Sequence, residues 1–192
     1  GMDQGQVVQL ADQVNYLSNT TAASSDSISD IVTRVGPLGQ VAGISASQIA
    51  AIGASMASVG VESDVAATGI KNMAIGLVAG AGATKSQQEA FVQLGLSAED
   101  VAKRMQTDAQ GTIINVLSRI KELPKEMQAS VLSDLFGKES INAIAPLLTQ
   151  LDNLKDNFNK VGDASQYAGS MDAEYQARVG TTANQLQLVK NN

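Results

Sequence analysis

The side chains best suited to acid–base chemistry in this 192-residue chain are carboxylates that occur in close pairs. They are Asp26 with Asp30, Glu62 with Asp64, Glu99 with Asp100, and Asp152 with Asp156. Two carboxyl groups on either side of a substrate can act as general acid and general base, as in glycoside hydrolysis. None of these pairs is flanked by the aromatic or polar residues that usually shape such a site. We therefore interpret them as solvated helix faces or helix caps.

The sequence contains neither histidine nor cysteine. This composition excludes thiolate nucleophiles, imidazole bases, disulfides and the usual ligands of zinc or haem. Residues 78–86, VAGAGATKS, carry the glycines of a phosphate-binding loop, but the spacing is wrong and no strand pattern precedes them, which favours a turn. We expect no catalytic, cofactor-binding or metal-binding residues, no cofactor, and no enzymatic activity.

The charge distribution argues against nucleic-acid binding. The net charge is −6, and residues 1–70 contain one cation, Arg34, and six acids. An acidic surface repels phosphate groups, so we expect no specific nucleic-acid partner. Lysines and glutamates alternate around Pro124 and predict a mixed-charge surface instead of a basic patch.

Apolar residues recur almost everywhere at spacings of three, four or seven, and alternating runs are missing, so the chain is predicted to be all-α. The expected architecture is an array of short antiparallel helices with pairs of helices rich in small residues and a longer C-terminal helix. A single bundle and two subdomains both remain open. With 44% apolar residues but three Phe, three Tyr and no Trp, the core should have modest stability for its size.

Helix boundaries follow from caps and breakers. The first helix carries Val7, Leu10, Val14 and Leu17, and the second is expected at residues 27–35, stopped by Gly36 and Pro37, with a hinge up to Gly43. Further on we expect caps at Ser45, Ser86 and Ser97, ends at Gly60, Gly95 and Gly137, inward-facing Val59 and Met127, a helix starting at Pro124, and a kink or break at Pro146.

Glycines are concentrated in residues 45–82. They are Gly53, Gly60, Gly69, Gly76, Gly80 and Gly82. Each glycine inside a helix costs about 1 kcal/mol relative to alanine, so something must offset the loss. The first interpretation is close backbone approach between two helices. The second is deliberate weakness, which would make these helices the first to open.

The composition changes from Ala164 onward to Gln, Asn, Ala and Thr. Apolar or small side chains recur there in a narrow stripe at Met171, Tyr175, Thr182, Leu186 and Val189. A narrow seam suits pairing with another helix or with another copy of the chain. Packing on the same domain is an equally favoured alternative.

Residues 94–148 contain an ordered set of elements: LGLSAEDV, a small-residue turn at Gly111, an amphipathic helix, the Leu123–Pro124 break, and LSDLFGKESINAIAPLL. Together with the small-residue helices of residues 45–73, this set resembles the core of phage tail tape measure proteins. The resemblance implies a virion protein of a phage or prophage that sets tail length. It also implies partners, namely other copies of itself, the tail tube protein, tail assembly chaperones and distal tail proteins.

The same resemblance implies a location in the lumen of the tail tube, in the host cytoplasm during assembly, and a contact with membrane only at the stage of DNA ejection. The expected division is residues 1–43 as N-terminal helices of a longer upstream region, 44–161 as the helical core domain, and 162–192 as a truncated C-terminal helix. Gly1 before Met2 is typical of a scar left by tag removal, and the helical pattern stops at Asn191 and Asn192 without a cap, which suggests a fragment of a longer protein. The alternative function is a helical pore-forming or membrane-remodelling module built on residues 45–82.

Overall fold

The computed structural model describes residues 2–190, with side chains through residue 181, and all of its secondary structure is helical. The prediction of an all-α array is confirmed. The α-helices are α1 (Gln4–Thr20), α2 (Ser25–Ala42), α3 (Ala46–Ala57), α4 (Ser63–Val78), α5 (Lys85–Gln93), α6 (Ala98–Thr107), α7 (Ala109–Glu122), α8 (Lys125–Phe136), α9 (Ile141–Thr149), α10 (Leu151–Gly162), α11 (Ala164–Tyr167) and α12 (Ser170–Lys190). Two 3₁₀ turns, η1 (Gly80–Gly82) and η2 (Lys138–Ser140), complete the described chain.

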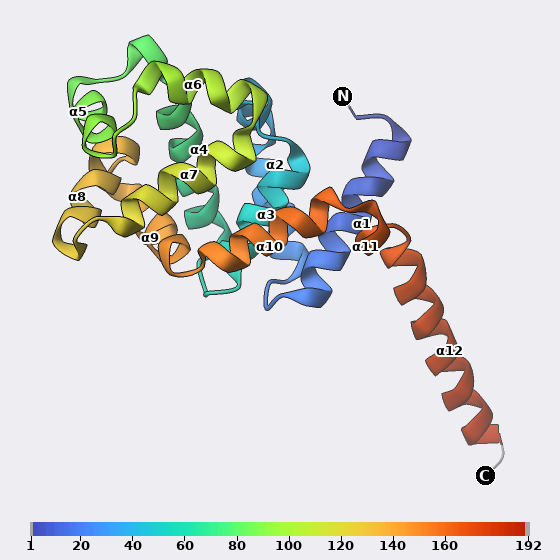
Figure 1. Ribbon diagram of the computed structural model, residues 1–192. Helices are drawn as coiled ribbons and strands as arrows, with labels where there is room; N and C mark the ends of the chain where they lie inside the picture. Colours follow the sequence, from blue (N-terminus) through green and yellow to red (C-terminus); the bar gives the residue numbers. More distant parts are fainter. Residues whose placement is uncertain (1, 191–192) are drawn as a thin grey trace.

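Helix α4 lies at the centre of the body. It packs against α2, α3, α6, α8 and α9, while α10 runs along α3 (Figure 1). One hydrophobic cluster extends from Val14 to Val161. It crosses the predicted boundary at residue 43, and the division of the chain into three parts stays a prediction.

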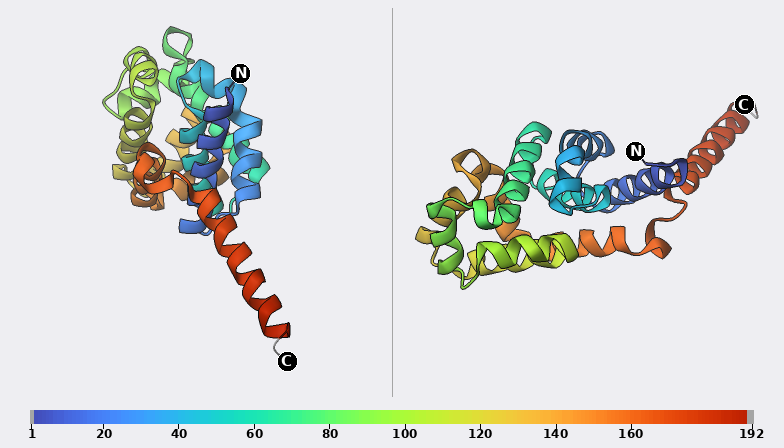
Figure 2. Two further views of the ribbon diagram at one scale, coloured as in Figure 1. Left: turned by 90° about the vertical axis from the view of Figure 1, so that its right-hand side faces the viewer. Right: turned by 90° about the horizontal axis from the view of Figure 1, so that it is seen from above.

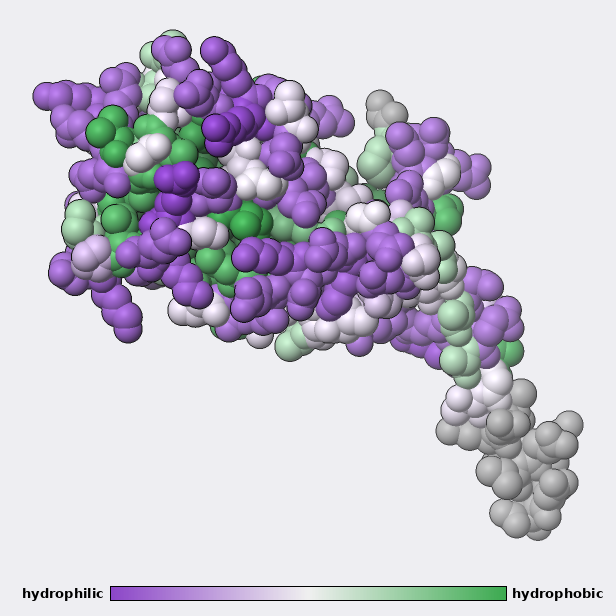
Figure 3. All heavy atoms as spheres, in the orientation of Figure 1, coloured by the Kyte–Doolittle hydropathy of each residue, from purple (hydrophilic) through white to green (hydrophobic). Residues whose placement is uncertain are grey.

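Helix α12 is the longest helix and leaves the body as a single rod (Figures 1 and 2). A longer C-terminal helix was expected from the sequence. The face of the body shown in Figure 3 is mostly hydrophilic, with small patches of apolar side chains between the hydrophilic ones. No helix among the described residues is both long and apolar enough to cross a membrane.

The predicted stop at Gly36 and Pro37 is wrong, and so is the hinge after it. Helix α2 continues through Pro37 to Ala42. Its buried face repeats without interruption at Ile28, Ile31, Val35, Gly39 and Ala42, and burial of this face against α3 and α4 outweighs the missing N–H of the proline. The helix ends instead at Gly43, which has a left-handed φ of 76°.

Pro146 likewise lies inside α9 without breaking it. The break comes four residues later at Gln150, where φ is −121°. Ala143, Ile144, Leu147 and Leu148 are buried on both sides of the proline and hold the helix in place. The predicted break at Pro146 is therefore wrong, and the helix ends at Gln150 instead.

Smaller corrections concern caps and inward-facing residues. Ser45 and Ser97 cap α3 and α6 as predicted, whereas α5 is capped by Thr84 and not by Ser86. Val59 and Met127, expected to face inward, are 41% and 39% exposed. Gly111 does not form the expected small-residue turn between helices. It belongs to the start of α7, where its N–H donates to the Asp108 carboxylate at 2.9 Å.

The glycines of α3 and α4 mark close approaches between helices. A Cβ on Gly69 would lie 2.4 Å from the Ala143 Cβ of α9, and one on Gly76 would lie 2.5 Å from the Leu135 carbonyl oxygen of α8. A Cβ on Gly53 would meet Ile31 of α2 at 3.1 Å. Close approach therefore explains these glycines, although their partners are α2, α8 and α9 and not the other helix of the pair.

We expect Gly69→Ala and Gly76→Ala each to lower the free energy of unfolding by about 1–3 kcal/mol, because the new methyl group overpacks the contact. Chemical denaturation of the purified chain measures this. Gly36→Ala is the matched control: it also lies inside a helix, and its Cβ would meet nothing within 4 Å. It should instead raise the stability by about 0.5–1 kcal/mol. Equal effects at the three positions would contradict the close-approach interpretation.

The packing also argues against early opening of residues 45–82. Every residue from Ile49 to Met56 is buried, and α4 contacts five other helices. We expect hydrogen exchange to be slowest in α3 and α4 and fastest in α12, because local opening is favoured where few buried contacts exist. Exchange that begins in residues 45–82 would restore the weakness interpretation.

Candidate functional site

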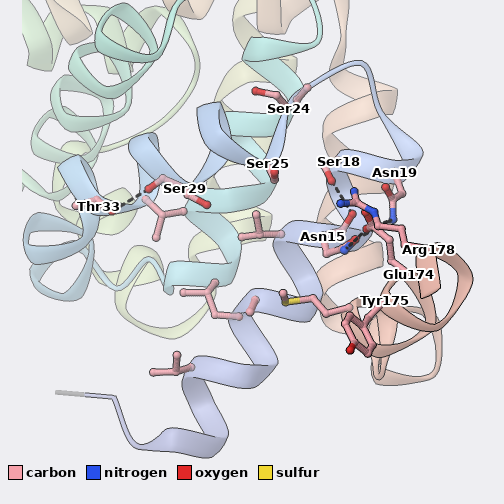
Figure 4. Close-up of a pocket in the computed structure, with 17 residues that line it drawn as sticks. Asn15, Ser18, Asn19, Ser24, Ser25, Ser29, Thr33, Glu174, Tyr175 and Arg178 are labelled. Carbon is pink, nitrogen blue, oxygen red and sulfur yellow. Dashed lines mark hydrogen bonds and ion pairs between the residues drawn. The ribbon is translucent and has the colours of Figure 1, made fainter. Parts of the chain in front are cut away.

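A groove of about 830 Å³ lies between α1, α2 and α12 (Figure 4). Its apolar lining comes from Val7, Leu10, Ala11 and Val14 of α1, Ala23 before α2, Val32 of α2, and Met171 and Tyr175 of α12. Its polar rim consists of Ser24, Ser25, Ser29 and Thr33 on one side and Asn15, Ser18 and Asn19 on the other. The groove thus has an apolar floor and polar edges that are largely uncharged.

Several apolar side chains of α1 and α12, at or near this groove, are exposed. Val7 is 51% exposed and Tyr175 is 63% exposed, and Val8, Met171 and Val179 lie on the same two helices. Many of the large apolar residues exposed in the described chain therefore belong to α1 and α12. A concentration of this kind is typical of a surface that meets another molecule.

Charge in the groove is nearly balanced. Its charged lining residues, Glu174 and Arg178, form an ion pair one turn apart on α12. The amide of Asn15 donates to the Glu174 carboxylate at 2.6 Å. Hydrogen-bonding and apolar contacts, more than charge, would select an occupant.

The start of α12 depends on a residue of α1. Asp12 is only 8% exposed, and its carboxylate accepts hydrogen bonds from the N–H groups of Gly169 at 3.1 Å and Met171 at 3.0 Å. N–H groups at a helix start have no partner within the helix, and Gly169, which precedes α12, has no side chain that could cap them. Asp12 therefore acts as the helix cap from a distant part of the chain.

Two more polar side chains of α1 hold the segment before α12. Gln13 donates to the Val161 carbonyl at 2.9 Å and accepts from the Ser47 hydroxyl at 2.6 Å. Gln9 donates to the hydroxyl of Tyr167, which is buried, at 2.8 Å. This cluster was not predicted from the sequence. The signal was a run of hydrogen-bonding side chains beside the apolar stripe of the first helix.

Helix α11 has a cap of its own. The Asp163 carboxylate accepts from the side chain of Ser165 at 2.6 Å and from the side chain of Gln166 at 3.0 Å. The hydrogen bond from the Ser165 hydroxyl, followed by that from Gln166, lowers the pKa of the Asp163 carboxyl. Because this pKa lies below its unfolded value, the contribution of the cap is present at neutral pH and lost as the pH falls through the lowered pKa.

The paired carboxylates do not meet in a common site. Most of them lie at exposed helix starts, where acids favour the helix dipole: Asp26 in α2, Glu62 and Asp64 in α4, Glu99 and Asp100 in α6, and Asp152 in α10. Asp30 forms an ion pair with Arg34 at 2.9 Å. Residues 2–181 contain no group of three potential metal-ligating side chains. The glycines after Val78 form the turn η1 and not a phosphate loop.

These features define an all-α protein with a helix-lined groove and a projecting helix. Residues 1–137 match the family model of phage-related minor tail proteins, and the chain belongs to that family. It is 39% identical over 170 residues to a "Probable tape measure protein" of Halomonas phage phiHAP-1. The aligned segment covers 88% of this chain and 20% of that protein. No solved structure matches the chain.

The similarity confirms the resemblance to tape measure proteins noted in the sequence. The chain spans about a fifth of the length of that relative. Membership of this family makes the chain a phage tail protein. Its particular partners and its role in the tail are matters of proposal.

The exposed apolar floor should bind an environment-sensitive hydrophobic dye. We expect Val7→Gln to weaken dye binding several-fold, because it places an amide in the groove, and to leave stability within about 0.5 kcal/mol, as is usual for surface substitutions. Fluorescence titration gives the affinity. Val92→Gln is the control, since Val92 is 72% exposed on α5, away from the groove. Equal loss in both variants would show that the dye binds elsewhere.

Proposed function

We propose that this chain is a segment of a tail tape measure protein, which sets the length of the phage tail during assembly. The supporting observation is its membership of the minor tail protein family together with 39% identity to the phage phiHAP-1 protein over most of its length. The proposal includes a place in the lumen of the tail tube, an earlier stage in the host cytoplasm, and a part in DNA ejection.

The structure constrains how such a segment could measure length. Drawn into one helix, 192 residues would span about 290 Å at 1.5 Å per residue. A compact domain of this size has a radius of gyration of about 16 Å. Helix α12 departs from the compact body as a rod (Figure 1). In its folded form the body therefore adds little length, and α12 is the described element with the geometry of a ruler.

The proposed partners are other copies of the chain, the tail tube protein, the tail assembly chaperones and the distal tail proteins. The groove between α1, α2 and α12 is the described surface best suited to one of them, because an apolar floor with polar edges matches an amphipathic helix. The stripe expected to mediate self-association begins on α12 with Met171 and Tyr175, and both side chains are exposed. Thr182, Leu186 and Val189 lie outside the side chains described.

The alternative of a pore-forming module rests on residues 45–82. In the structure the small residues of α3 and α4 are buried against α2, α8 and α9. Membrane insertion would require this pair to leave the centre of the core. No structural feature favours this second candidate.

The test uses the full-length protein in a phage or prophage that encodes it. Tandem copies of residues 170–190 are inserted directly after residue 190. Each copy adds 21 residues, or about 32 Å of helix, and tails should lengthen by about that amount per copy. Electron microscopy of purified particles measures tail length.

A flexible insertion of equal length in the turn after Gly82 is the control. Its position is open, and it adds residues to the folded body without extending a helix, so tails should keep their length. The proposal fails if tails assemble at unchanged length with one, two and three added copies of residues 170–190.

A further inference from the structure

Helix α12 lacks a capping residue in its own segment. It begins after Gly169, which has a left-handed φ of 76°, and its first free N–H groups bind the carboxylate of Asp12, 157 residues earlier in the chain. The cap exists only while α1 is docked against the start of α12. The orientation of α12 is thereby tied to one side chain of another helix.

Further hydrogen bonds join α1 to the C-terminal segment. Asn15 donates to Glu174, and Gln9 donates to the hydroxyl of Tyr167. On the groove side Met171 and Tyr175 stay half-exposed or more, so little apolar surface joins α12 to the body. Hydrogen bonds of this kind are readily exchanged for bonds to water and contribute little net stability each.

Helix α10 is anchored differently. Leu154 and Phe158 are buried in the core, and the amide of Asn157 donates to the Ser55 hydroxyl of α3 at 2.9 Å. Burial of an apolar side chain contributes more to stability than a typical hydrogen bond does. Loss of the polar contacts to α12 would therefore leave α10 in place.

The chain between these two differently held helices contains two glycines. Gly162 ends α10 and Gly169 precedes α12, and a Cβ at either position would meet nothing within 4 Å. Glycine crosses between φ regions at little cost, and Gly169 already occupies the left-handed region. The four-residue helix α11 thus lies between two points at which the backbone can turn.

We infer that Asp12 is a latch, a side chain that holds α12 in one orientation and whose release lets α12 turn about Gly169 while the body stays folded. Helix α12 supplies one wall of the groove through Met171, Glu174, Tyr175 and Arg178. Release of the latch therefore also opens the groove, and an occupant of the groove can favour the latched or the released state. This inference concerns the isolated chain and does not rest on the proposed function.

The experiment measures the orientation of α12 directly. The chain has no native cysteine, so Val41→Cys on the body and Ala177→Cys on α12, both at exposed positions, take two spin labels selectively. Pulsed electron spin resonance then gives the distribution of label distances. The latched protein should show one narrow peak. Asp12→Ala should raise the population outside that peak about five- to ten-fold, the usual effect of losing a helix cap.

Asp26→Ala is the matched control, because Asp26 is an exposed aspartate in the first turn of α2 and binds none of the residues of the latch. Asp12→Asn keeps one acceptor oxygen and should give an intermediate population. Hydrogen exchange in α4 reports the state of the body and should be unchanged in each variant. Equal distance distributions for Asp12→Ala and Asp26→Ala would overturn the latch. Loss of protection in α4 would also overturn it, because Asp12 would then support the whole fold.

Discussion

The packing of this protein depends on two buried glycines of the central helix α4, Gly69 and Gly76. Because Gly69 and Gly76 let α4 approach α9 and α8 closely, the central helix can touch several neighbours at once. A chain with three Phe, three Tyr and no Trp cannot fill wide gaps between helices with large rings. Close backbone approach supplies the packing instead, since dispersion contacts depend on short distances between many atoms. The loss of helix stability at each of these glycines is offset by the close packing that the same glycine permits.

Burial of a continuous apolar face also explains where local sequence rules succeed and fail. Serine caps and glycine ends were predictable at Ser45, Ser97 and Gly95, because these signals act within one turn and α3, α5 and α6 obey them. The proline rules failed at Pro37 and Pro146. In both helices the buried side chains before and after the proline belong to one stripe, and packing of that stripe against other helices is not visible in a local window of sequence.

The groove and the cap at Asp12 were beyond sequence reasoning for a different reason. Both depend on residues of α1 that meet residues of α12 more than 150 positions later, and no periodicity links such positions. The carboxylate pairs, by contrast, were recognisable as caps and solvated faces, because acids at helix starts follow a local rule. The family itself was recognisable from ordered local elements in residues 94–148, which the match to a phage tape measure protein bears out.

The contacts of α1 have a consequence for synthesis. Chains are made from the N-terminus onward, so α1 is made well before α10, α11 and α12, with which it packs in addition to α2 and α3. The contacts of α1 with these three helices can therefore form only after residues 151–190 have been made. Contacts of such long sequence separation form slowly, because the loop that joins them must close first. The surface of α1 that contacts these later residues carries Gln9, Asp12 and Gln13, whose polar side chains water can solvate until then. A polar surface that stays exposed during synthesis lowers the risk of aggregation that an exposed apolar surface would bring to a nascent chain.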